Sequence, residues 1–178
     1  MQTYTVDDYE KLSGEDRWEL IKGVFHMFMA PAPMRRHQDI SGNLYNELTP
    51  SKKRKKYKIY FAPFDVELSK DTVVQPDICL ISDFGKLTEK RCVGSPDLII
   101  EILSKSSERR DCVDKLDIYE QFKVKEYWIV TPNTETVSVY VLGEDEEYMD
   151  PVRYAKTDSI HLSFDADVTI DLNNVFDY

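Results

Sequence analysis

Two acidic residues lie inside apolar segments of the sequence, where a carboxylate needs a compensating partner. Asp77 lies in VVQPDICL (residues 73–80), and Glu101 lies in LIIEIL (residues 98–103). An unpaired buried carboxylate is unstable, so such a residue persists where a cation or hydrogen bonds compensate it. Two carboxylates on adjacent strands can converge, and hard oxygen ligands suit Mg²⁺ or Mn²⁺ better than zinc. The pair predicts a metal site, although either acid alone could instead end a strand or pair with an arginine.

A lysine in the segment after Glu101 is the third candidate. A helix is predicted from a cap at Ser106 or Ser107 to about Phe122. Its apolar residues form one stripe, and Lys115 lies at the edge of that stripe. The side chain could therefore extend along the apolar surface with its ammonium in solvent. It could also direct the ammonium at the Glu101 carboxylate.

Other polar residues are candidates for substrate contacts or accessory roles. His37 precedes Ile40, Leu44 and Leu48 on a predicted amphipathic helix from Met34 to Leu48. It is a candidate nucleic-acid contact, although a lone histidine there is more often structural. Glu19, between Trp18 and Leu20, is a partly buried acid candidate. The basic run Lys52, Lys53, Arg54 and Lys55 could bind phosphates or form a solvated loop.

The elements that must position these residues alternate between helix and strand. Helices are predicted at residues 6–17, 34–48, 106–122 and 173–176, and extended structure at 19–29, 57–68, 73–82, 97–103, 126–130, 136–142 and onward to about 170. Gly23 and Lys70-Asp71 suit turns, and the acidic stretch 144–147 suits a hairpin tip. This order predicts an α/β (α+β) fold, a mixed β-sheet flanked by α-helices in a single domain of residues 1–178.

Charge and composition limit the function classes. The chain has 178 residues and a net charge of -10, and residues 141–178 hold ten Asp or Glu against two Lys or Arg. This balance argues against a non-specific DNA-coating protein, but it leaves room for a local basic groove. No stretch approaches the ~20 apolar residues of a membrane span, and no cysteine pair has metal-binding spacing. We expect a cytoplasmic protein with free thiols and no membrane anchor.

Several blocks, taken in order along the chain, resemble a known family. They are Trp18-Glu19-Leu20-Ile21-Lys22-Gly23, the break at residues 30–33 followed by His37-Gln38, APFDV at 62–66, VVQPD at 73–77, GSPDLIIEILS at 94–104, Arg110-Asp111 with Lys115 and Tyr119, and EYWIV at 126–130. Together they resemble the Uma-type family of putative restriction endonucleases, within the PD-(D/E)XK nuclease superfamily. The resemblance runs from about residue 5 to residue 142.

This resemblance implies a restriction-endonuclease-like core and a metal-dependent DNA endonuclease. Asp77 and Glu101 would hold Mg²⁺ (or Mn²⁺), with the backbone carbonyl of Ile102 as a further ligand and Glu19 as an accessory acid. The superfamily's lysine normally falls where this chain has Leu103, and here it looks relocated to Lys115, with Lys105 as the alternative.

Two further expectations concern the protein as a whole. The alternative to a nuclease is a non-catalytic nucleic-acid-binding or structural protein that keeps the nuclease fold. A homodimer would supply a second active site for the second DNA strand. The apolar and aromatic strands from Tyr127 to Val139 could form its interface.

Overall fold

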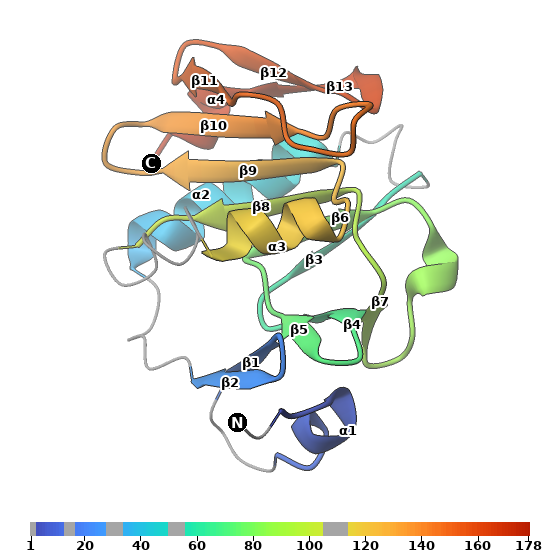
Figure 1. Ribbon diagram of the computed structural model, residues 1–178. Helices are drawn as coiled ribbons and strands as arrows, with labels where there is room; N and C mark the ends of the chain where they lie inside the picture. The colour runs from blue at the N-terminus through green and yellow to red at the C-terminus, as the bar shows by residue number, and fades with distance from the viewer. Residues whose placement is uncertain (1–2, 13–16, 28–33, 50–55, 105–113) are drawn as a thin grey trace.

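The computed structural model describes residues 3–12, 17–27, 34–49, 56–104 and 114–178 (Figure 1). Its helices are α1 (Val6–Tyr9), α2 (Arg35–Leu48), α3 (Lys115–Gln121) and α4 (Leu172–Val175), with a 3₁₀ turn η1 (Phe84–Lys86). Its strands are β1 (Trp18–Ile21), β2 (Val24–Met27), β3 (Lys58–Phe61), β4 (Asp65–Ser69), β5 (Thr72–Val74), β6 (Ile78–Ile81), β7 (Arg91–Val93), β8 (Leu98–Ile102), β9 (Glu126–Thr131), β10 (Thr136–Val141), β11 (Val152–Ala155), β12 (Ser159–Leu162) and β13 (Asp165–Asp171).

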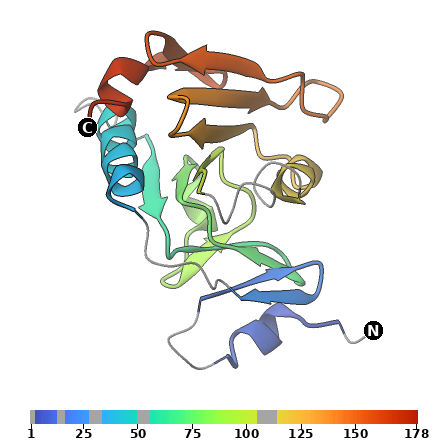
Figure 2. The ribbon, with the colours of Figure 1, turned by 90° about the vertical axis from the view of Figure 1, so that its left-hand side faces the viewer.

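The strands form a mixed central sheet and two smaller sheets. The central sheet has the order β11-β10-β9-β8-β6-β3, and β8 and β9 are its parallel pair. All five residues of β8 are buried, because α2 covers one face of this sheet and α3 the other (Figure 2). A five-stranded sheet, β2-β1-β5-β4-β7, lies beside it. The predicted mixed α+β architecture is confirmed.

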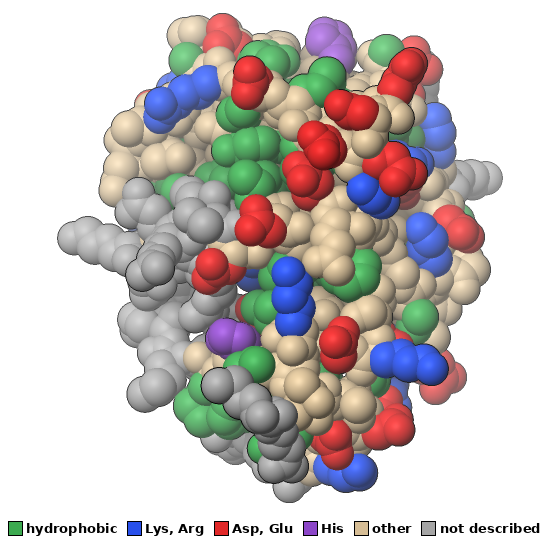
Figure 3. Space-filling model, viewed as in Figure 1, with side chains coloured by type: hydrophobic (Ala, Val, Ile, Leu, Met, Phe, Trp, Pro, Cys, Tyr) green, Lys and Arg blue, Asp and Glu red, His purple; other side chains and the backbone are tan. Residues whose placement is uncertain are grey.

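The C-terminal part of the chain forms the opposite end of the molecule. The hairpin β12–β13 and the helix α4 pack beyond β10, and residues 144–147 lie in the connection that follows β10, as predicted. Acidic side chains gather on the upper half of the face shown in Figure 3, where these C-terminal strands lie. The negative charge found in the sequence of residues 141–178 is therefore placed away from β1 and β2.

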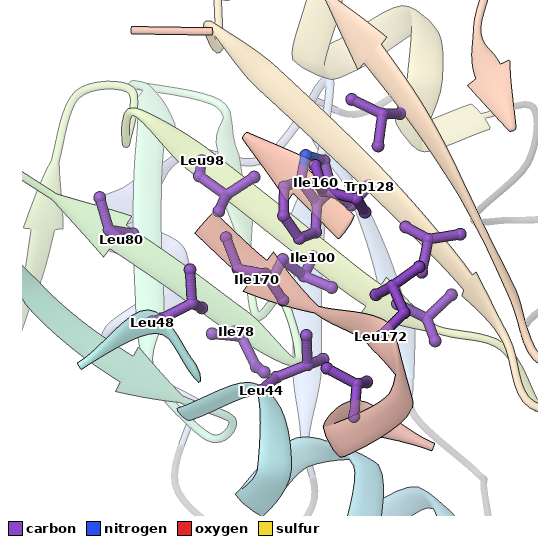
Figure 4. Packing of buried hydrophobic residues seen from close by; sticks show 14 of the residues in the cluster. Leu44, Leu48, Ile78, Leu80, Leu98, Ile100, Trp128, Ile160, Ile170 and Leu172 are labelled. Atoms are coloured by element: carbon purple, nitrogen blue, oxygen red, sulfur yellow. The ribbon is translucent and has the colours of Figure 1, made fainter. Parts of the chain in front are cut away.

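Apolar residues bury both faces of the central sheet. On one face, Ile100 and Trp128 pack with Leu44 of α2 and Ile170 of β13 (Figure 4). On the other face, residues such as Ile99 and Tyr127 pack with Tyr119 of α3. Neighbouring residues of β8 thus alternate between the two clusters. The predicted stripe Ile40, Leu44 and Leu48 is fully buried on α2, as its spacing requires.

Two long predicted strands are each divided between the two larger sheets. The segment 57–68 breaks at residues 62–64 into β3 and β4, and the segment 73–82 breaks at residues 75–77 into β5 and β6. Pro63 and Pro76 stand at these breaks, and proline cannot donate a hydrogen bond to a sheet. Consequently β3 and β6 pair in the central sheet, while β4 and β5 pair in the other one. Asp77 lies at this crossing point, directly before β6.

Some other expectations need correction or lie outside the described residues. The helix predicted at 6–17 is the single turn α1, and α3 begins at Lys115. Ser106, Lys105 and Cys112 fall outside the described residues. The strands from Tyr127 to Val139 were expected to supply a dimer interface. Both of these end residues are buried, and β9 is an interior strand, so β9 cannot supply that interface. Among the described residues, no helix is long and apolar enough to cross a membrane.

Candidate active site

Asp77 and Glu101 are joined through the backbone of adjacent strands. The strands β6 and β8 are antiparallel with Ile78 opposite Ile100, so Asp77 comes beside Glu101. The amide of Ile102 donates to Asp77 Oδ2 at 2.8 Å, and the amide of Asp77 lies 3.4 Å from Glu101 Oε2. Each carboxylate therefore contacts the strand that carries the other one.

Lys115 reaches into the same place from α3. Its ammonium lies 2.6 Å from Glu101 Oε1 and 3.1 Å from Glu19 Oε1, and its side chain is 1% exposed. Tyr119, one turn later on α3, donates a second hydrogen bond to Glu101 Oε1 at 3.0 Å. Because Lys115 contacts two carboxylates, the helix α3 joins the central sheet to β1. The sequence allowed the Lys115 ammonium either to lie in solvent or to point at Glu101, and in the structure it points at Glu101.

Glu19 is fixed by the segment that carries Asp77. Its Oε1 also accepts a hydrogen bond from the amide of Gln75 at 2.9 Å. The side chain of Gln75 donates to Asp65 at 2.8 Å and accepts from Arg17 at 3.2 Å. Tyr9 donates to the same Asp65 oxygen, and burial together with the charge of Asp65 raises the pKa of Tyr9 far above its ordinary value. Tyr9 therefore stays protonated and acts as a donor in this network.

Asp77 also lines a cleft of about 250 Å³ beside α2. Its Oδ2 lies 3.1 Å from Nε2 of His37, and both side chains are partly exposed. The other residues that line the cleft are Arg17, Gln38, Ser41, Gly42, Phe61 and Ala62. Asp77 thus contacts the backbone of β8, which carries Glu101, on one side and lines the cleft on the other.

The chain is similar to known proteins over nearly its whole length. The model of the Uma2 family, described as "putative restriction endonuclease", matches residues 6–173. The chain belongs to the Uma2 family. A crystal structure of a putative nuclease belonging to DUF820 from Anabaena variabilis ATCC 29413 is similar over 97% of both chains, with a TM-score of 0.77 and 19% sequence identity. That similarity establishes the fold. A search of curated proteins gives no match.

Asp77 and Glu101 supply carboxylate oxygens, which are the donor type that a magnesium-type cation prefers. Among the described residues, no group of three or more His, Cys, Asp or Glu side chains could hold a metal ion. Mg²⁺ commonly uses only one or two carboxylates and completes its shell with water and substrate phosphate oxygens. A zinc site would need three or four protein ligands. The amide of Ile102 donates to Asp77. The carbonyl of Ile102, which the family resemblance implies as a further metal ligand, therefore lies in the backbone next to Asp77.

The structure also adds contacts that the sequence did not show. The sequence marked Tyr119 only as part of the family resemblance, and in the structure its hydroxyl contacts Glu101. Its spacing of four residues from Lys115 was the available signal. His37 contacts Asp77, which sequence spacing could not show. The basic residues Lys52, Lys53, Arg54 and Lys55 lie outside the described residues, so their contribution stays a prediction.

Proposed function

We propose that this Uma2-family protein is an endonuclease that hydrolyses phosphodiester bonds of DNA with Mg²⁺ (or Mn²⁺). The observation that carries the proposal is the meeting of Asp77 and Glu101 on adjacent strands with the Lys115 ammonium 2.6 Å from Glu101. These residue types match the needs of phosphodiester hydrolysis, which are cation binding and stabilisation of developing negative charge. Family membership supports the same activity.

Asp77 and Glu101 are the residues that would hold the cation, with the Ile102 carbonyl as a further ligand. When bound, the cation supplies an acidified water and polarises a phosphate oxygen. Lys115 stabilises the charge that develops on the phosphate or orients the attacking water. Glu19 acts through Lys115, because it contacts the ammonium at 3.1 Å and limits the directions in which the side chain can point.

The position of Lys115 favours catalysis over a non-catalytic nuclease fold. The non-catalytic alternative rested on Leu103, which occupies the usual place of the superfamily's lysine. Leu103 packs against the hydrophobic cluster on the α3 face of the central sheet, whereas Lys115 brings an ammonium to Glu101 from the following helix. The chemical group that seemed missing at residue 103 is therefore available from residue 115.

The proposal also covers how DNA approaches the protein, the state of assembly and the cellular location. The DNA substrate should approach away from the acidic C-terminal strands, because phosphates are repelled by carboxylates (Figure 3). The run Lys52 to Lys55 is proposed to add phosphate contacts. A homodimer would supply the second active site needed for both strands, through a surface other than β9. We place the activity in the cytoplasm.

Cleavage of plasmid DNA by purified protein tests the proposal. Wild-type protein should cut in Mg²⁺ or Mn²⁺ and stop cutting in EDTA, and Asp77→Ala should abolish cleavage. Asp97→Asn is the control, because it removes another carboxylate charge at the far end of β8 from Glu101. RNA tested in parallel distinguishes the substrate. Full cleavage by Asp77→Ala, or cleavage that persists in EDTA, would contradict the proposal.

A further inference from the structure

Three side chains that line the cleft beside Asp77 have no role in the proposed hydrolysis. The wall of the cleft holds a cationic guanidinium at Arg17, an imidazole at His37 and an aromatic ring at Phe61. Phe61, the last residue of β3, is 36% exposed. It rests on Tyr45 of α2, with ring centroids 5.4 Å apart and an interplanar angle of 56°. One side of the Phe61 ring is thus supported by α2 while part of it remains open.

A glycine in the middle of α2 forms the floor of the same cleft. A Cβ placed on Gly42 would meet nothing within 4 Å, and Gly42 does not have a positive φ. Neither packing within the chain nor backbone conformation therefore requires glycine there. Glycine inside a helix costs about 1 kcal/mol relative to alanine. Gly42 therefore destabilises the helix α2, and its lack of a side chain leaves this part of the cleft open.

We infer that this cleft is a subsite for one unpaired nucleotide of the substrate strand, with the base on Phe61 and the phosphate near Arg17 and His37. The inference rests on the proposed function, since it names the substrate segment next to Asp77. Base stacking on an aromatic ring combined with cationic contacts to the backbone is how proteins bind single strands. A volume of about 250 Å³ suits one such unit, whereas a duplex cannot enter it.

Arg17 lines the cleft, where it can contact a phosphate, and its side chain is held in position by a hydrogen bond. Its Nε donates to the side chain of Gln75 at 3.2 Å, two residues before Asp77. His37 is held by its contact with Asp77 at 3.1 Å. Both groups are therefore positioned by the segment that carries the proposed metal ligand. The nucleotide bound in the cleft would place its phosphate beside the carboxylate that the reaction needs.

Binding of a fluorescein-labelled oligothymidylate of about twelve nucleotides tests the subsite. Fluorescence anisotropy is measured in Mg²⁺ on ice, and the length of the oligonucleotide is checked afterwards on a gel. Phe61→Leu keeps an apolar side chain and removes the ring, so affinity should fall about tenfold. Phe84→Leu is the matched control, because Phe84 is an aromatic residue of 42% exposure that does not line the cleft. It should bind as wild type does.

Gly42→Leu tests the open floor of the cleft independently. Leucine favours a helix, so the thermal midpoint should be at least that of wild type, while affinity for the oligonucleotide falls about tenfold or more. Asn46→Leu, at an exposed position one turn further along α2, is the control and should leave affinity unchanged.

Four results would overturn the inference. They are wild-type affinity in Phe61→Leu, an equal loss in Phe84→Leu, wild-type affinity in Gly42→Leu, and no binding by wild type up to about 100 µM protein. Plasmid cleavage by the same proteins separates the two proposals. Cleavage with no dependence of binding on Phe61 would refute the subsite alone, and Phe61-dependent binding without cleavage would refute the nuclease alone.

Discussion

The two ends of strand β8 carry buried carboxylates with different partners. Asp97, just before β8, accepts hydrogen bonds from the Ser82 amide at 2.6 Å and from Lys125 at 2.6 Å. Glu101, near the other end, contacts Lys115 at 2.6 Å and the Asp77 amide at 3.4 Å. Each acid thus contacts one backbone amide and one lysine, and Glu101 also accepts a hydrogen bond from Tyr119.

The lysines distinguish the two sites. The Lys125 side chain is 54% exposed and contacts one carboxylate, whereas the Lys115 side chain is 1% exposed and contacts both Glu101 and Glu19. A half-exposed pair is screened by water and is worth little, while a buried cluster pays a large desolvation cost. The pair of Asp97 and Lys125 therefore has the properties of a structural ion pair. The Glu101 end keeps an arrangement that is unfavourable for folding, because its buried charges lose their hydration.

The largest expected effect is a loss of plasmid cleavage when the acid is replaced at the Glu101 end of β8, but not when it is replaced at the Asp97 end. Glu101→Gln should reduce plasmid cleavage on the order of 10³-fold, because a cation ligand is lost while Glu19 still balances the charge of Lys115. Its free energy of unfolding should stay within about 1 kcal/mol of wild type. Asp97→Asn should cut at the wild-type rate. Equal losses in the two variants would remove the functional distinction between the ends.

The second effect concerns stability. Lys115→Met leaves two buried carboxylates without their shared ammonium and should lower the free energy of unfolding by about 3 kcal/mol, as measured by urea denaturation. Lys125→Met removes a half-exposed partner and should cost about 0.5 kcal/mol. Similar values for both variants would mean that the burial of Lys115 has no energetic consequence.

The smallest effect is a pH dependence at the Asp97 end. Burial raises the pKa of Asp97, but hydrogen bonds from Lys125 and Ser82 outweigh it and hold this pKa below its ordinary value. The stabilisation is therefore present above the ordinary carboxyl pKa and is lost as the pH falls through the lowered one, below about pH 4. Asp97→Asn should flatten this part of the curve of stability against pH. An unchanged curve would show that Asp97 contributes nothing to acid stability.

Part of the site followed from the sequence because its signals are local. Acids within apolar strands marked Asp77 and Glu101, and helical spacing placed Lys115 on a core-facing stripe. The grouping of these residues around one cleft could not be found in this way. His37 and Phe61 meet Asp77 only because α2 packs beside the end of β3, and no local pattern specifies that contact. Similarly, apolar alternation predicted extended structure around Pro63 and Pro76, but it carried no information about which sheet each half would join.

The crossing of the chain between the two larger sheets has a consequence for how the site comes into being. Glu19 belongs to one sheet, Glu101 to the other, Asp77 to the segment that passes between them, and Lys115 to a helix formed later in the chain. Contacts between such distant residues are made only after long loops have closed. No short peptide fragment contains all four residues. A partly synthesised or partly folded chain therefore cannot bring Glu19, Glu101 and Lys115 together, because their contacts need both layers in place.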